Sequence, residues 1–174
     1  ASQTLRPDPV WGMQAPVLTS ETLTHGSLTM KITGSRTATL GTVGNPFSVT
    51  TEIQKQIING RVYTSTFTGS SHSWVHTSPV GRTLTLGLDS LERVASTQVE
   101  GLLASDFAYD SRGRLSTITQ GTRKTTFTYD SDGRLATTID PFGLKKSFTY
   151  DADGRMLSAT PVSYTHLTLP TILR

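Results

Sequence analysis

Along much of the chain, apolar and polar residues alternate one by one, which is the pattern of half-buried β-strands. The alternation runs through residues 28–32, 62–67 and 84–88, and the second of these runs follows an Asn-Gly pair that is typical of tight turns. The first 16 residues hold three prolines, which cannot donate to a β-ladder, so we expect residues 1–16 to be irregular. The rest of the pattern predicts short strands joined by turns, and therefore an all-β fold.

Composition supports this class. The 174 residues include 31 Thr, 19 Ser and 15 Gly, and only 17% are charged. A helical bundle would use Ala, Leu, Glu and Lys where this chain uses Thr and Gly, and a disordered chain would carry more charge and fewer aromatic residues. There is no cysteine, which excludes disulfides, thiolate zinc sites and cysteine nucleophiles.

The charge pattern excludes other classes of function. Lys and Arg number 16 against 13 Asp and Glu, a net charge of +3, and no cationic run is longer than two residues, as in Arg123-Lys124. We therefore expect no nucleic-acid partner. No apolar run approaches the roughly 18 residues of a membrane span. The chain opens on Ala1 without a signal peptide, and we interpret the sequence as a fragment.

One motif recurs three times: Phe-x-Tyr-Asp-x-x-Gly-Arg, followed by Leu or Met. Its aspartates, Asp110, Asp130 and Asp151, are 20 and 21 residues apart, and Asp89 heads a degenerate copy 21 residues before the first. Copies that keep one phase indicate a repeat architecture. The motif positions are Tyr109, Asp110, Gly113, Arg114, Tyr129, Asp130, Gly133, Arg134, Tyr150, Asp151, Gly154 and Arg155.

Each copy predicts a β-hairpin. Phe and Tyr two positions apart lie on one face of a strand. Asp at the first turn position and Gly at the fourth favour a type I turn that closes at positive φ. Ordering about 20 residues costs roughly 20–40 kcal/mol of backbone entropy. Burying the hairpin's few large apolar side chains returns only about 1.5–3 kcal/mol each. We therefore expect neighbouring hairpins to pair edge to edge in a twisted, spiralling antiparallel sheet.

Three regions follow from these marks. Residues 1–77 are interpreted as a Thr-rich β region with degenerate repeats, and residues 78–160 hold the clear repeats. Residues 161–174 fail the repeat test, because no Tyr-Asp or Gly-Arg recurs at the expected positions. This tail resembles one reading frame of a sequencing-library adapter, and we expect it to be non-native; the alternative is a genuine terminal strand.

The Tyr-Asp-x-x-Gly-Arg-Leu unit at a spacing of about 21 residues resembles the YD-repeat, or Rhs-repeat, family. That family includes bacterial Rhs polymorphic toxins, the C component of insecticidal toxin complexes, and teneurins. The resemblance implies a hollow β-shell around a C-terminal toxin domain that this fragment lacks. The implied partners are the rest of the shell and the enclosed toxin, and the implied location is secreted or on a bacterial cell surface. The motif residues would build the wall, and none is catalytic in the family.

A second element of that family is also similar. Asp140, Pro141, Gly143 and Leu144 belong to a segment that resembles the element at which bacterial members cleave themselves. A full repeat follows it here, and Ser78-Pro79 occupies the same place three periods earlier. A plain inter-repeat turn is the preferred interpretation, with Pro fixing φ and Gly finishing the bend; cleavage is the alternative.

The remaining candidates for chemistry are weak. The Asp-x-Asp-Gly runs at Asp130 and Asp151 resemble half of a calcium loop but lack its further ligands, so we expect solvated hairpin turns. His72 and His76 would lie about 13 Å apart on a strand, too far to share a metal ion. No catalytic motif is present, and we expect neither an enzyme nor a cofactor.

The repeated Arg and Tyr leave one alternative open. An Arg four residues after each motif Asp predicts a turn-spanning contact. The same Arg and Tyr side chains could instead form a ladder that binds glycans, as in a surface adhesion or carbohydrate-binding module. Contact of Tyr129 and its equivalents with neighbouring hairpins would favour the wall; a row of exposed rings would favour the module.

Overall fold

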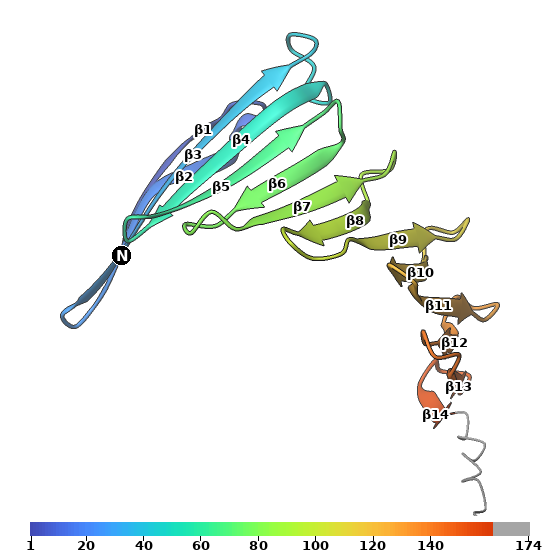
Figure 1. Cartoon of the computed structure of the whole chain (residues 1–174). Coiled ribbons are helices and arrows are strands. Elements are labelled where there is room, and N and C mark those ends of the chain that lie inside the picture. The colour runs from blue at the N-terminus through green and yellow to red at the C-terminus, as the bar shows by residue number, and fades with distance from the viewer. Residues whose placement is uncertain (162–174) are drawn as a thin grey trace, which may run out of the picture. The chain divides into compact units, whose positions relative to one another are not determined.

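The computed structural model describes residues 1–161, and all of its regular elements in that range are β-strands. The chain divides into two compact units, Ala1–Ser105 and a second unit that begins at Asp106. Figure 1 colours the first from blue to yellow-green and the described part of the second from ochre to red. Among residues 1–161 there is no helix long and apolar enough to cross a membrane. The all-β expectation is confirmed.

The first unit is an antiparallel sheet in which each strand pairs with the next along the chain. Its strands are β1 (Ser2–Asp8), β2 (Gly12–His25), β3 (Leu28–Leu40), β4 (Val49–Ile58), β5 (Arg61–Thr68), β6 (Ser73–Thr77), β7 (Thr83–Leu88) and β8 (Val94–Val99). The alternating runs at 28–32, 62–67 and 84–88 all lie in strands, as predicted. β2 and β3, with 14 and 13 residues, are much longer than the repeat period requires.

The expectation for residues 1–16 was wrong. β1 covers residues 2–8 and β2 begins at Gly12, so the two strands together cover most of that stretch. β1 pairs with β2 through two register shifts, one of them between Arg6 and Asp8. A proline is tolerated on an edge strand or beside such a bulge, because its missing N–H is not needed for the ladder there. Pro7 lies at the second register shift, so β1 continues through it.

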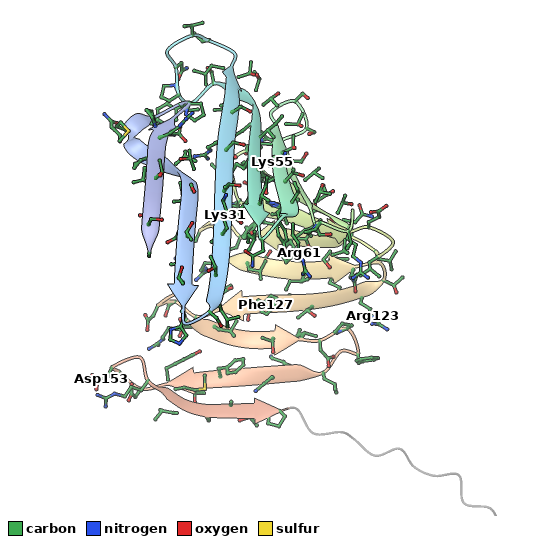
Figure 2. The ribbon with its side chains drawn as sticks, turned by 90° about the vertical axis from the view of Figure 1, so that its left-hand side faces the viewer. Lys31, Lys55, Arg61, Arg123, Phe127 and Asp153 are labelled. Carbon is green, nitrogen blue, oxygen red and sulfur yellow. The ribbon has the colours of Figure 1, made fainter. Side chains whose placement is uncertain are left out.

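The second unit is a meander of short antiparallel strands. They are β9 (Ser105–Tyr109), which begins at the unit boundary, β10 (Leu115–Gln120), β11 (Arg123–Tyr129), β12 (Leu135–Ile139), β13 (Lys145–Tyr150) and β14 (Met156–Pro161). Two strands of five to seven residues and two turns make up each period, which confirms the predicted tandem hairpins. Figure 2 labels Phe127 on β11 and Asp153 at the turn between β13 and β14.

Burial is sparse throughout the described residues. Phe67, 9% exposed, is the buried hydrophobic side chain of the first unit, and most other strand residues are half-buried. A thin sheet cannot hide side chains as two packed layers do, so contacts between neighbouring strands must supply most of its stability. The contacts that cross from one repeat to the next are therefore the natural place to look for a functional site.

Candidate functional site

Every repeat turn closes with the same pair of backbone hydrogen bonds. The Asp110 N–H donates to the carbonyl oxygen of Arg114 at 2.8 Å, and the Gly113 N–H donates to the carbonyl oxygen of Asp110 at 2.9 Å. The Asp110 Oδ1 atom accepts the backbone N–H groups of Arg112 and Arg114, both at 2.9 Å. The same backbone pair closes the turns that begin at Ser78, Asp89, Asp130, Asp140 and Asp151.

The fourth position of these turns is left-handed, as the sequence predicted. The glycines at this position have φ between 79° and 86°: Gly81, Gly113, Gly133, Gly143 and Gly154. Only glycine occupies this region without strain. The degenerate copy carries Glu92 there instead, with a φ of 60°. The degeneration of that repeat is therefore visible as a strained residue in an otherwise unchanged turn.

The motif arginine holds the motif aspartate across the turn. The Arg114 Nε and Nη2 atoms lie 2.8 and 2.7 Å from the Asp110 Oδ2 atom. Equivalent contacts join Arg93 to Asp89 and Arg134 to Asp130. Between 26% and 31% of each of these three arginine side chains is exposed, so the predicted turn-spanning contacts are partly buried.

The same contacts lower the pKa values of the turn carboxyls. For Asp89 and Asp110 the main cause is the hydrogen bond from the partner guanidinium, which stabilises the ionised form. Desolvation raises the pKa of Asp130, but the backbone N–H and guanidinium of Arg134 outweigh it, so this pKa is also lowered. These carboxyls are thus ionised at neutral pH and fully used in holding their turns.

Consecutive repeats are joined by the motif tyrosine. The Tyr129 hydroxyl donates to the carbonyl oxygen of Leu115 at 2.8 Å, although Leu115 belongs to the preceding hairpin. The Arg114 guanidinium carbon lies 4.2 Å from the centre of the Tyr129 ring, within cation–π range. Arg114 therefore contacts its own turn with its N–H groups and the next repeat with its flat face.

The next pair of repeats is joined in the same way. The Tyr150 hydroxyl donates to the carbonyl oxygen of Leu135 at 2.9 Å, and the Arg134 guanidinium carbon lies 5.0 Å from the Tyr150 ring centre. The Arg134 Nη1 atom adds a bond of 3.2 Å to the carbonyl oxygen of Asp151. We call this recurring set of contacts the Arg-Tyr staple. It uses both the ring and the hydroxyl of each of these two tyrosines.

Arg155 departs from this pattern. Its side chain is 79% exposed, and its ion-pair contact is with Asp153 at 3.7 Å. Its backbone N–H still donates to the Asp151 Oδ1 atom at 2.8 Å, so the turn itself is intact. The turn therefore forms without the guanidinium contacts that Arg114 and Arg134 make.

Comparison with known families agrees with this geometry. Residues 109–145 and 129–163 match the sequence profile of the RHS Repeat family, which spans the stapled hairpins. This part of the chain consists of YD/Rhs repeats. Proteins with Rhs repeats are generally extracellular or cell-surface proteins. A search of the curated proteins found no match to this Rhs-repeat chain.

The cleavage-like segment of this Rhs-repeat protein forms an ordinary turn. The Asp140 Oδ1 atom accepts the N–H groups of Phe142 and Leu144, both at 2.9 Å, as in the motif turns. Pro141 occupies the second turn position, Gly143 has a φ of 82°, and Phe142 projects outward. The backbone here has the same geometry as a repeat turn.

The two histidines that the sequence singled out have different partners. His72 is in the turn before β6, where its Nε2 atom is 3.1 Å from the Glu92 Oε1 atom. His76 is in β6, where its Nδ1 atom is 2.7 Å from the Ser65 Oγ atom. A nucleophilic serine needs a histidine that is itself oriented by a third group. The ion pairs found among residues 1–161 give His76 no carboxylate partner, so this contact is a cross-strand pair.

The calcium-like runs also have a local explanation. The Asp132 Oδ2 atom accepts a hydrogen bond of 2.6 Å from the Arg134 Nη2 atom, and Asp153 forms an ion pair with Arg155. No group of three metal-ligating residues is found in the described part of the chain. The proposed adapter tail lies outside the described residues, apart from Pro161, which ends β14.

Sequence reasoning missed one cluster, an ionic triad in the first unit. Asp8 and Glu52 are only 3% and 7% exposed, and Arg36 bridges them. Burial raises the pKa of Asp8, but N–H groups of Trp11 and Val10 and the Arg36 guanidinium outweigh it, so the pKa is lowered. These residues come from β1, β3 and β4, and no local motif connects them.

Proposed function

We propose that this chain is a wall segment of an Rhs-type shell that encloses a toxin domain lying outside this sequence. The role is structural and non-catalytic, and the protein acts outside a bacterial cell or on its surface. The observation that carries the proposal is the Arg-Tyr staple. A ring that is covered by the preceding repeat's arginine, with its hydroxyl bonded to the preceding repeat's backbone, holds two hairpins together and is poorly placed to bind a ligand.

The proposal can be tested on the full-length protein that contains this segment. Limited proteolysis should leave the domain downstream of the shell uncut in the native protein. The Tyr129→Ala/Tyr150→Ala double variant should expose it. Tyr63→Ala is a matched control, because Tyr63 lies on β5 outside the stapled repeats and is 39% exposed. Equal proteolysis of the downstream domain in all three proteins would contradict an enclosing wall.

A carbohydrate-binding module is the second candidate, and one observation favours it. The exposed Tyr63 ring lines an open groove of about 530 Å³ together with the side chains of Gln54, Gln56 and Ser65. An aromatic face beside amide and hydroxyl groups is suited to a neutral sugar. A glycan array decides between the two: clear binding that Tyr63→Ala abolishes without unfolding would favour the module.

A further inference from the structure

The first two hairpins of the sheet come apart along part of their length. β2 pairs with β3 only where Ser20–His25 faces Leu28–Thr33. The earlier part of β2 pairs with β1, and β3 from Gly34 onward pairs with β4. Within the described residues, no ladder therefore joins the first half of β2 to the second half of β3. We call the space between them the fork.

At the base of the fork, β2 passes over one face of the sheet. The carbonyl oxygen of Leu18 lies 2.5 Å from the position that a Cβ atom on Gly34 would occupy. Glycine is needed here for a close backbone approach, not for an unusual φ. Beyond this crossing, Ala15–Leu18 lines the groove of about 530 Å³ together with Arg36 and Gln54.

Two contacts hold the β1–β2 hairpin against that face. The Arg36 Nη1 atom lies 2.7 Å from the Asp8 Oδ2 atom, and its Nε atom lies 2.6 Å from the Glu52 Oε1 atom. At the hairpin tip, the Trp11 ring meets the Phe47 ring edge to face, with centroids 5.6 Å apart. We call these two contacts the clasp.

Burying the three charged groups of the triad has a high desolvation cost. Desolvating three charged groups is expensive, and such a cluster is repaid only by close, well-directed contacts. Here two nearly buried carboxylates share one arginine as their ion-pair partner, in a unit that otherwise buries very little. Loss of that arginine would leave Asp8 with only its backbone donors and Glu52 with only Gln54, both without a counter-ion, so hairpin closure depends strongly on a single side chain.

We propose that the β1–β2 hairpin is a strap that opens as a unit, pivoting at the Leu18–Gly34 crossing and held shut by the clasp. Opening breaks no strand ladder between β2 and β3, because none exists above the crossing. It widens the groove and moves the facing backbone edges of β2 and β3, which share no ladder there, further apart. This inference does not depend on the shell proposal.

Hydroxyl-radical footprinting of the full chain tests the strap, because it reads the exposure of side chains while the β1–β2 hydrogen bonds stay intact as the hairpin moves. In the Arg36→Met variant, the groove-lining side chains of Val17 and Ile32 should be oxidised about twofold faster or more, while side chains of β6 and β7 keep their native oxidation rates. Lys55→Met is the matched control, because Lys55 projects from β4 near the same groove without a place in the triad (Figure 2). It should leave the rates unchanged. Uniform acceleration across the first unit, or no acceleration, would overturn the proposal.

A crosslink gives a second readout that does not require removing a charge. The native chain has no cysteine, so Trp11→Cys/Phe47→Cys introduces the sole thiols. Joining them with a short bifunctional thiol reagent should slow the oxidation of Val17 and Ile32 about twofold relative to the same variant left unjoined. If these side chains are oxidised at the same rate in the joined and unjoined proteins, the hairpin does not open at its tip and the strap does not exist.

Discussion

The two units of this chain stabilise a thin sheet by opposite means. The second unit uses the same Arg-Tyr staple at successive repeats, so each hairpin carries its own turn and its own link to the hairpin before it. The first unit uses long strands and one concentrated ionic triad that joins residues 28 and 16 positions apart. The repeated device loses little when one copy degenerates, whereas the concentrated device depends on each of its members.

The staple gives the largest expected effect. Tyr129→Ala should lower the free energy of unfolding of the second unit by about 2–3 kcal/mol, because it removes a half-buried ring and leaves Arg114 without its stacking partner. Tyr129→Phe should lose about 0.5–1.5 kcal/mol, the net value of the hydroxyl's hydrogen bond to Leu115. Urea denaturation measures both values.

The matched control for the staple lies in the first unit. Tyr63→Phe should change the free energy of unfolding by less than about 0.5 kcal/mol, since the ring is on a partly exposed strand position. Equal losses from Tyr129→Phe and Tyr63→Phe would mean that the bond to Leu115 contributes nothing specific, and the contrast between the units would fail.

Two glycine substitutions separate the units by mechanism. Gly34→Ala should destabilise the first unit by about 1–3 kcal/mol, because the new methyl group meets the carbonyl oxygen of Leu18. Gly143→Ala should destabilise the second unit by about 1 kcal/mol. The new methyl group has open space around it, so the loss comes only from the φ of 82°. Thermal or urea denaturation of both variants gives the comparison. A larger loss from Gly143→Ala would reverse the assignment.

How much of this could be predicted from sequence follows the same division. The turns were predictable because their determinants are local: an Asp, a Gly at positive φ and an Arg within five residues. The hydrogen bond from the Tyr129 hydroxyl to Leu115 joins residues 14 positions apart. It depends on the register between β10 and β11, which no motif specifies. The triad was invisible for the same reason, and the error in residues 1–16 came from applying a central-strand rule for proline to an edge strand.

The turns should lose stability in acid and not near neutral pH. The pKa values of Asp89, Asp110 and Asp130 are lowered on folding, below the ordinary value of about 3.9. Their contribution is therefore complete above about pH 5 and is lost as the pH falls through the lowered values. Unfolding midpoints in urea should be flat from pH 7 to 5 and should drop below pH 4.

Asp110→Asn provides the test of that assignment. The variant should have a lower midpoint at pH 7 and a shallower loss in acid, because one of the titrating carboxyls is gone. Asp106→Asn is the control, since Asp106 is exposed on β9 outside the turn. An acid profile for Asp110→Asn as steep as that of the native protein would show that the loss in acid comes from other carboxyls, such as Asp8 in the first unit.

The smallest expected effect is a gain, and it lies at the one degenerate turn. Glu92 holds a φ of 60° where the other repeats have glycine, so Glu92→Gly should relieve backbone strain of about 1 kcal/mol. It also removes the exposed contact with His72, which offsets part of the gain. The melting temperature should rise by about 2–4 °C.

Glu92→Gln keeps the strained backbone but loses the charge, so it should show no rise in melting temperature. If Glu92→Gln stabilises the protein as much as Glu92→Gly, charge and not backbone conformation limits this turn, and the degenerate copy owes its weakness to something other than its missing glycine.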